Sequence, residues 1–278
     1  MKNTIILLTV ILFSTVAWSQ KKEKIKASKI VTVSQKEIGN FDSLEILDNI
    51  DVFLVKGNSC AIEIEADDNT HEIIDFKLSG STLRIGLTHD ITGAKKTSVR
   101  VTYTDSFKML VAKGEADVTA LAEVKLDDIT FKCYDESRLF LNANCKNFTL
   151  IANDKSKVEI NLKSEDTVLE LSKNAYVKGL ISTLKLKCDM YQKSIAIIEG
   201  DADDFKLRMD NYSNFTGKNL TSKTASLIVE ANSKNSILAT TKLILEASGK
   251  SETHFYGEGK VELKKFVEEA TLFKKLLK

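Results

Sequence analysis

The sequence predicts an all-β solenoid, a stack of short β-strand coils that share one continuous core. Three observations carry this prediction: a 19-residue repeat, apolar columns two positions apart within each repeat, and the absence of proline from all 278 residues. Proline lacks the N–H that a β-ladder needs, so strands that are hydrogen-bonded along both edges have little room for it. Average proteins contain about 5% proline.

Residues 1–19 have the pattern of a secretory signal. Lys2 supplies a positive charge, residues 5–16 form an uncharged apolar run, and residues 17–19 (Ala-Trp-Ser) place small side chains where a signal peptidase reads them. The apolar run is shorter than the roughly 20 residues that a membrane-spanning helix needs. We therefore expect residues 1–19 to be removed and Gln20 to become the new N-terminus; an uncleaved anchor is the alternative.

The charge pattern excludes two classes of partner. Removal of Lys2 with the signal lowers the formal charge from +1 to 0, and no block of like charge occurs anywhere in the chain. Nucleic acids and anionic membrane surfaces both select a basic patch, so neither is expected as a partner. No second apolar stretch is long enough to cross a membrane as a helix. A hydrophobic content of 43% is enough to build a folded core.

The repeat is regular over about residues 107–257. The 19-residue step connects small or turn-forming residues, namely Ser137, Ser156, Ala175, Ser194, Ser213, Asn232 and Ser251. The same step connects three apolar columns, which begin at Ile129, Phe131 and Cys133 and include Thr224, Ser226 and Ile228 in the sixth coil. Columns two positions apart have the period of a strand, not the 3.6-residue period of a helical repeat. An up-and-down sandwich would not keep so constant a step. An earlier coil at Leu110 fits after a 21-residue step.

The two flanks of the repeat are less regular. Residues 20–27 read as an N-terminal tail, and alternating segments such as 50–54 and 83–87 predict strands with looser spacing, so we expect one solenoid domain over residues 28–262. Within residues 263–278, four apolar residues fall on one face of a helix among lysines and glutamates, namely Phe266, Ala270, Phe273 and Leu277. This amphipathic segment predicts a short C-terminal helix that caps the open end of the stack.

Four cysteines in an exported protein raise the question of disulfides. Cys133 and Cys188 fall in inward columns three coils apart, which is about 14 Å at the usual strand spacing and too far for a disulfide. Both are therefore expected as small core residues. A bond between Cys145 and Cys133, or between Cys60 and an unknown partner, stays open.

Several segments resemble a family known from Bacteroidota, the DUF2807 or "head GIN domain" proteins described as auto-transporter adhesins. The resemblance lies in the strand-and-turn patterns of residues 41–46, 49–57, 83–85, 99–103 and 113–118. It implies a secreted, single-stranded, right-handed parallel β-helix-like solenoid, in keeping with the 19-residue coils. It brings no catalytic residues and no cofactor to this sequence.

A search for catalytic chemistry finds two pairs of carboxylates. Asp135 and Asp154 share one column, and Glu170 and Asp189 share another, so each pair would lie roughly 5 Å apart at the backbone. Such pairs could serve a polysaccharide lyase or hydrolase on a β-helix scaffold. Lysine or arginine lies near both pairs, as on an ordinary solvated face, which favours a structural role.

Other reactive groups are scattered. The three histidines have no partner at a metal-ligand spacing, and no nucleophile elbow, phosphate loop or dinucleotide fingerprint occurs, so we expect no metal and no cofactor. Asp201, Asp203 and Asp204 form a small acidic segment, read as a solvated turn.

Exposed tyrosines are the candidates for binding. Tyr134 and Tyr191 share an outward column, and Tyr176 and Tyr212 lie near the turns, where they could grip a glycan or a surface protein. The sequence thus favours a non-enzymatic structural or interaction module, with adhesion as one candidate role, in the periplasm, on the outer-membrane surface or outside the cell. The alternative is a carbohydrate-active enzyme.

Overall fold

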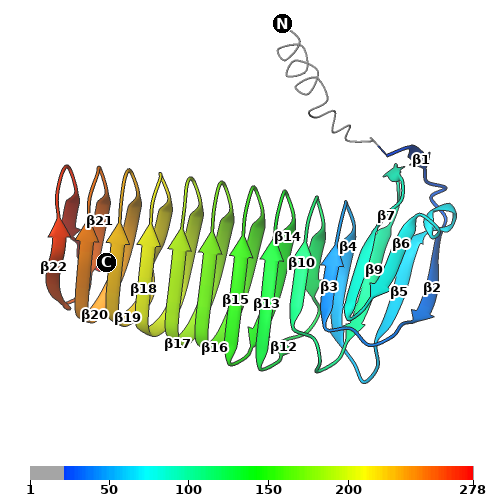
Figure 1. The fold of residues 1–278 in the computed structure, drawn as a ribbon, viewed down its shortest axis with the longest axis horizontal. Coiled ribbons are helices and arrows are strands. Elements are labelled where there is room, and N and C mark those ends of the chain that lie inside the picture. Colours follow the sequence, from blue (N-terminus) through cyan, green and yellow to red (C-terminus); the bar gives the residue numbers. More distant parts are fainter. Residues whose placement is uncertain (1–21, 278) are drawn as a thin grey trace, which may run out of the picture.

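The computed structural model describes residues 22–277, so the expected signal at 1–19 lies outside the described residues. These residues form a β-solenoid of about nine turns, whose coils stack along the long axis from the blue N-terminal end to the red C-terminal end (Figure 1). This confirms the predicted fold class. No helix in this part of the chain has the length and apolar character needed to traverse a bilayer.

Each coil contributes one segment to each of two sheets. In order along the stack, the first sheet contains β6 (Ile74–Ser79), β7 (Thr82–Leu87), β3 (Ser43–Ile46), β10 (Met109–Ala112), β13 (Asp128–Cys133), β15 (Asn147–Ala152), the second halves of β16 (Lys157–Leu171), β17 (Tyr176–Met190), β18 (Ile195–Met209), β19 (Asn214–Val229) and β20 (Lys234–Ala247), and β22 (Lys260–Phe266). The second sheet contains β2 (Val31–Glu37), β5 (Ala61–Asp67), β9 (Thr97–Tyr103), β4 (Asp51–Lys56), β11 (Asp117–Ala120), β14 (Arg138–Asn144), the first halves of β16 to β20, β21 (Glu252–Tyr256) and β23 (Thr271–Lys274).

Three short strands and one helical turn complete the fold. Strand β12 (Val124–Lys125) pairs with β14, and β1 (Lys24–Lys26) pairs with β8 (Asp90–Thr92) in a separate two-stranded sheet. A 3-10 helix, η1 (Asp68–Thr70), follows β5. Strand β1 therefore orders part of the segment expected as an N-terminal tail.

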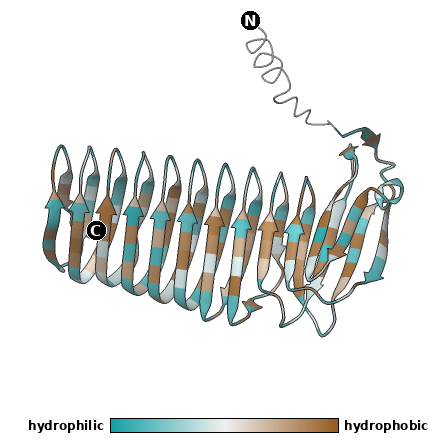
Figure 2. Ribbon diagram, viewed as in Figure 1, coloured by the Kyte–Doolittle hydropathy of each residue, from teal (hydrophilic) through white to brown (hydrophobic). Residues whose placement is uncertain are grey.

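The core follows from the alternation of side chains along each strand, which Figure 2 shows as alternating brown and teal bands. The predicted columns lie in register: Phe131 pairs with Leu150, and Leu150 pairs with Leu169. Their side chains are buried, and the rings of Phe131 and Phe148 lie 5.9 Å apart in neighbouring columns. The 21-residue step to Leu110 is also confirmed, because Leu110 pairs with Phe131.

The constant 19-residue step is wrong in one coil. Strand β19 contains one extra residue, with a register shift between Ile197 and Gly200 of β18, and β20 is correspondingly short. The column members there are Ala225, Leu227, Val229 and Ser233, in place of the predicted Thr224, Ser226, Ile228 and Asn232. A bulge absorbs the extra residue without breaking the sheet, so the next coil returns to the original columns.

The predicted C-terminal helix is also wrong. Residues 260–266 form β22 and residues 271–274 form β23, each added in parallel to the preceding coil. The apolar spacing fits a helix, but Ala270 also lies one 19-residue step after Ser251 and so continues the turn column. The free edges of β20 and β21 offer a ladder of backbone hydrogen bonds, which favours another coil over an isolated short helix.

All four cysteines are free and buried in the described structure. Burial raises the pKa of the Cys133 thiol to about 12 and that of Cys145 to about 11. The prediction that Cys133 and Cys188 are core residues is confirmed. The two disulfides left open by the sequence are not formed.

Candidate functional site

The most regular surface feature is a row of turns along the upper edge of Figure 1, which we name the turn ridge. It is centred on residues with a left-handed backbone, φ between +53° and +70°: Asp48, Gly114, Asp135, Asp154, Lys173, Gln192, Asn211, Ala231, Gly249 and Glu268. Neighbouring turns are joined by backbone hydrogen bonds, such as Lys155 N–H to the carbonyl of Asp135 at 2.8 Å. A Cβ at Gly114 would lie 3.0 Å from the backbone nitrogen of Asp48, and φ is +69° there, so this turn favours glycine.

The first carboxylate pair lies on the turn ridge, and its carboxylates bond the backbone. The N–H of Gly114 donates to Asp135 Oδ2 at 2.9 Å, and the N–H of Asp135 donates to Asp154 Oδ2 at 3.4 Å. Lys173 donates to Asp154 Oδ1, and this hydrogen bond lowers the pKa of the Asp154 carboxyl. Each carboxylate thus ties its own turn to the turn before it.

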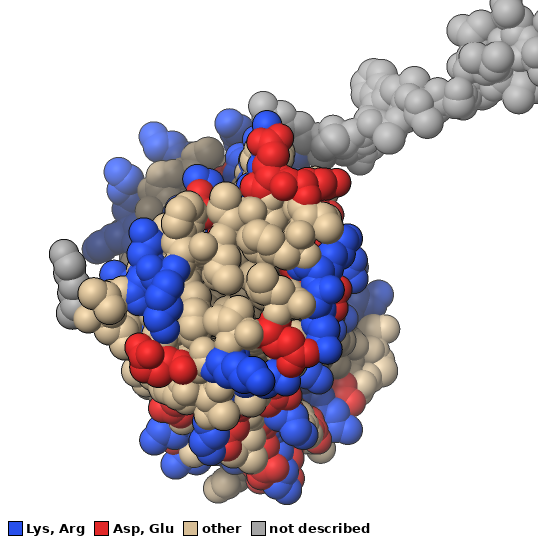
Figure 3. Space-filling view, turned by 90° about the vertical axis from the view of Figure 1, so that its left-hand side faces the viewer, with Lys and Arg blue, Asp and Glu red and all other residues tan. Residues whose placement is uncertain are grey.

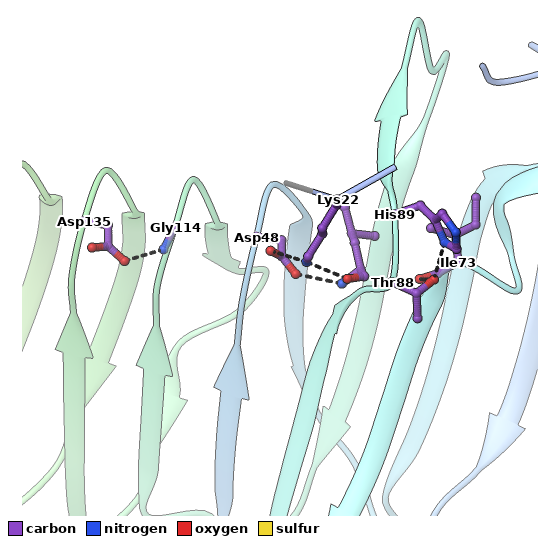
Figure 4. A network of polar contacts seen from close by, with 8 residues as sticks. Lys22, Asp48, Ile73, Thr88, His89, Gly114 and Asp135 are labelled. Carbon is purple, nitrogen blue, oxygen red and sulfur yellow. Dashed lines mark hydrogen bonds and ion pairs between the residues drawn. The ribbon is translucent and has the colours of Figure 1, made fainter. Parts of the chain in front are cut away.

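Asp48 repeats this arrangement at the start of the turn ridge. Its Oδ2 accepts the N–H of Leu87 at 2.8 Å, while Lys22 Nζ lies 2.6 Å from its Oδ1 (Figure 4). In the same view the carboxylate of Asp135 points toward Gly114 rather than into open solvent. Asp48, Asp135 and Asp154 thus form a carboxylate ladder, in which each carboxylate accepts a backbone N–H of a neighbouring coil.

The second pair lies on the outer face of the first sheet. Glu170 and Asp189 are register neighbours, as predicted, and Asp189 lies beside Arg208 on the next coil. Lys187 Nζ lies 2.7 Å from Asp189 Oδ2, and this hydrogen bond raises the pKa of Lys187. Asp189 thus has a cationic partner on its own strand.

The turn ridge also carries a depression of about 400 Å³, formed by three successive turns. Six residues line it, three with amide side chains, two lysines and one tyrosine: Lys173, Asn174, Gln192, Lys193, Asn211 and Tyr212. We name it the Tyr212 depression. Its lining residues come in pairs from three successive turns, so its position follows from the 19-residue repeat.

Tyr212 has an unusually exposed side chain and an unusual backbone conformation. Its side chain is 63% exposed, and its φ of +67° follows another left-handed residue, Asn211. Large side chains rarely adopt this conformation, which costs on the order of 1–2 kcal/mol. Strained residues of this kind cluster at functional sites, where the surrounding structure holds them in place.

The four predicted tyrosines do not form one site. Tyr134 and Tyr191 lie in the same column three coils apart, and Tyr176 lies on β17 beyond the turn. Of the four, only Tyr212 lines the Tyr212 depression. The depression also gathers Lys193 and three amide residues, Asn174, Gln192 and Asn211, that the sequence did not single out for binding. Their shared position in successive repeats was the available signal.

An apolar groove on the outer face of the second sheet was also missed. It has a volume of about 410 Å³, and Phe140 and Leu180 line it beside Glu159 and Lys178. Both apolar side chains occupy outward positions of strands β14 and β17, and Leu180 is 53% exposed. An apolar residue at an outward position of the alternation is the signal that could have found it.

Another hollow, of about 820 Å³, lies around β12 and the coil corners, with lysines and aspartates mixed along its walls. Lys146 Nζ is 3.5 Å from Asp127 Oδ1 there, so its charges largely satisfy one another. Lys163 and Glu165 add further opposite charges to the lining. This balance gives no preference for a charged ligand.

The remaining candidate groups serve the fold. His71 contacts the hydroxyls of Thr32 and Ser34 at 2.9 and 3.0 Å, and His254 pairs with Glu252 at 2.8 Å. Within residues 22–277, no group of three or more His, Cys, Asp or Glu side chains is placed to hold a metal ion. The acidic segment at 201–204 is part of strand β18 and not a turn.

Comparisons with known proteins identify relatives of the fold. Residues 40–259 match the family DUF2807, described as "Putative auto-transporter adhesin, head GIN domain". Three solved structures share the architecture: a "putative adhesin" from Parabacteroides merdae (16% identity, TM-score 0.65, 92% of this chain and 100% of that chain), a "Putative lipid binding protein" from Parabacteroides distasonis (13%, 0.66, 92% and 100%) and a "putative adhesin" from the same organism (16%, 0.65, 91% and 100%). At these identities they show a common fold alone. No curated protein matches the sequence.

Proposed function

The chain belongs to the DUF2807 family, and we propose that it is an exported, non-enzymatic adhesion module of the cell envelope that binds glycans at the Tyr212 depression. The family and the solenoid fold support an adhesin-like module that is not an enzyme. The apolar run of residues 5–16, followed by a small-residue cleavage pattern, supports export.

The observation that carries the proposal is the chemistry of the Tyr212 depression. An exposed tyrosine ring offers a flat apolar face for the C–H groups of a sugar ring, and its hydroxyl can donate or accept a hydrogen bond. Asn174, Gln192 and Asn211 supply amides that both donate and accept, which matches the hydroxyl groups of a saccharide. Lys193 adds positive charge suited to acidic sugars.

The arrangement of the turn ridge supports a role in binding over catalysis. Asp135 and Asp154 hold backbone N–H groups, and Lys173 lowers the pKa of Asp154. Glycoside hydrolysis instead needs one carboxyl group whose pKa is raised so that it can protonate the leaving group. The lowered pKa of Asp154 is the opposite of what that role needs.

A panel of neutral and acidic glycans tests the proposal by direct binding to the purified chain. We expect saturable binding of at least one glycan class, reduced at least tenfold by Tyr212→Ala. Tyr134→Ala is the matched control, because Tyr134 lies outside the Tyr212 depression. The proposal fails if no glycan binds, or if Tyr134→Ala reduces binding while Tyr212→Ala leaves it unchanged.

A further inference from the structure

The C-terminal end of the solenoid exposes part of its core. Val261, Leu263 and Phe266 occupy inward positions of β22, in line with the buried Leu243, Leu245 and Ala247 of β20. Their exposed fractions are 37%, 49% and 39%, because no described coil lies beyond them. Figure 3 shows this end as a tan surface bordered by both blue and red side chains.

The same end presents two unpaired strand edges. Among residues 22–277, β22 pairs only with β20, and β23 pairs only with β21. Unpaired edges of this kind offer backbone donors and acceptors that readily pair with another strand. The two edges belong to different sheets on either side of the core.

The β23 side of this end is partly covered by one lysine. Lys274 occupies an inward position, donates to the carbonyl of Gly257 and holds its Nζ 4.5 Å from the centroid of the Phe255 ring. Its side chain shields Phe255, which is buried. Among the inward positions of this end, the exposed apolar side chains lie on β22; Phe273, Leu276 and Leu277 add exposed apolar surface on and after β23.

A partner for this end must satisfy two edges and cover the apolar surface beside them. A single extended peptide can pair with only one edge, whereas the end of another solenoid presents two edges at the same spacing. A two-fold axis perpendicular to both sheets would place β22 antiparallel to the β22 of a second copy, and β23 antiparallel to its β23. Because this contact uses the same surface on both molecules, it closes into a dimer.

The N-terminal end does not offer an equivalent partner surface. It is closed by the antiparallel strands β2, β5 and β6 and by η1, and Ile62, Ile64 and Ile74 are buried there. Its outermost strands are β2, which turns Thr32, Ser34 and Lys36 inward, and β6, where Leu78 is 38% exposed. A head-to-tail contact would therefore set β23 against a row of polar side chains, whereas a two-fold contact sets each strand against an identical strand.

The charges on β22 also suit a two-fold contact. If Leu263 lies opposite Leu263 of the second copy, Glu262 lies beside Lys264 of that copy, at the bulge that follows Leu263 in β22, and the pair occurs twice. In one molecule Glu262 contacts both Lys242 and Lys264, which lowers the pKa of Glu262 to about 2 and keeps it ionised. A partner surface with charges of one sign only would be repelled either by Glu262 or by Lys242 and Lys264.

We propose that the C-terminal end is an association surface that pairs two copies of the chain end to end through β22 and β23. One coil supplies roughly 20 residues to each side, at the lower limit for a stable interface. The dimer would be about twice as long as one solenoid and would present two turn ridges, with one Tyr212 depression each.

Sedimentation velocity of the purified chain over a range of concentrations tests the proposal. We expect a species of twice the monomer mass, converted to monomer by Leu263→Glu. Leu180→Glu is the control, because Leu180 is similarly exposed but lies on the outer face of β17. A chain that is monomeric at every concentration, an open-ended polymer, or a dimer that only Leu180→Glu dissociates would overturn the proposal.

Cross-linking keeps the proposal testable if Leu263→Glu unfolds the last coil. All four natural cysteines are buried, so an introduced surface cysteine reports its own contacts. Mild oxidation should link Leu263→Cys into covalent dimers and leave Leu180→Cys monomeric. Equal yields from the two variants would contradict the end-to-end arrangement.

Discussion

The two ends of the solenoid terminate the stack of coils in different ways. At the N-terminal end, the chain reverses and adds antiparallel strands, and His71 ties the edge strand β2 to the segment after η1. At the C-terminal end, the parallel pattern simply continues through β22 and β23 until the described structure stops. The outermost strand β2 of the first end turns the polar residues Thr32, Ser34 and Lys36 inward, whereas the second end leaves the apolar Leu263 half exposed.

This difference shows that an inward position alone does not bury a solenoid residue. Burial also needs a neighbouring coil on each side. Leu245 and Leu263 are register partners of the same residue type, yet Leu245 is fully buried and Leu263 is 49% exposed. Stacking therefore adds stability coil by coil, and the last coil contributes least.

The largest expected effect on stability comes from a substitution that tests the comparison between Leu245 and Leu263 directly. Leu245→Ala should lower the free energy of unfolding by about 3 kcal/mol, because it leaves a cavity between two coils. Leu263→Ala, at the same column position, should cost less than about 1 kcal/mol. Denaturant unfolding of both variants at low protein concentration measures the two losses. Equal losses would show that the terminal coil is as well packed as the interior.

A second prediction concerns the closed end and its pH dependence. Asp67 is buried there, and burial would raise its pKa, but the N–H groups of Lys96 and Lys95, which donate to Oδ2 at 3.1 and 2.9 Å, lower it overall. A lowered pKa means that the unfolded chain takes up the proton more readily. The stability from Asp67 should be complete above a pH of about 4 and be lost as the pH falls through the lowered pKa.

Thermal unfolding followed between neutral and acidic pH tests the role of Asp67. Asp67→Asn should reduce stability at neutral pH and flatten the acid dependence. Asp68→Asn is the neighbouring control, since Asp68 is exposed on η1. If the stability of Asp67→Asn changes with pH in parallel with that of the unmodified chain, Asp67 is not the group responsible for the acid dependence.

A third prediction concerns the turn ridge that connects the two ends. Asp154→Ala should cost about 1–2 kcal/mol, because it removes the bonds to Asp135 N–H and Lys173 and leaves alanine in a left-handed backbone. Asp154→Gly removes the same bonds but restores the backbone preference, so it should be the more stable variant. The reverse order in chemical denaturation would show that backbone conformation is not what the turn requires.

The smallest expected effect is the slow reaction of the buried thiols in the middle of the stack with thiol reagents. Cys133 and Cys188 are fully buried with raised pKa values, so thiol reagents should modify them only as fast as the chain unfolds. Cys145, which is slightly exposed at a coil corner, should react first of these three. Rapid modification of Cys188 in the native protein would show that interior coils open more easily than the ends.

Much of the fold could be predicted because the solenoid is built from local repetition. The columns through Phe131 and Cys133 follow from spacing alone, since each coil stacks directly on the one before it. The extra residue in β19 could not be predicted, because a bulge changes the register without changing the composition of the strand. The C-terminal strands were read as a helix because a helical apolar spacing coincides there with the 19-residue step.

The functional site was harder to predict, because its residues are set by the backbone of the turns. The sequence identified Tyr212 but gave it equal standing with Tyr134, which lies outside the Tyr212 depression. It also paired Asp135 with Asp154 correctly, but spacing could not show that their oxygens are occupied by backbone N–H groups. Local turn geometry thus separates a structural carboxylate from a catalytic one.

The most direct test of the central claim is whether the carboxylate ladder supports structure or chemistry. The purified chain is incubated with a panel of acidic and neutral polysaccharides, and new reducing ends and unsaturated products are measured. We predict no products from the unmodified chain and a loss of thermal stability in Asp135→Ala and Asp154→Ala. Product formation that is abolished in either variant, with its fold intact, would contradict the account and identify the chain as a carbohydrate-active enzyme.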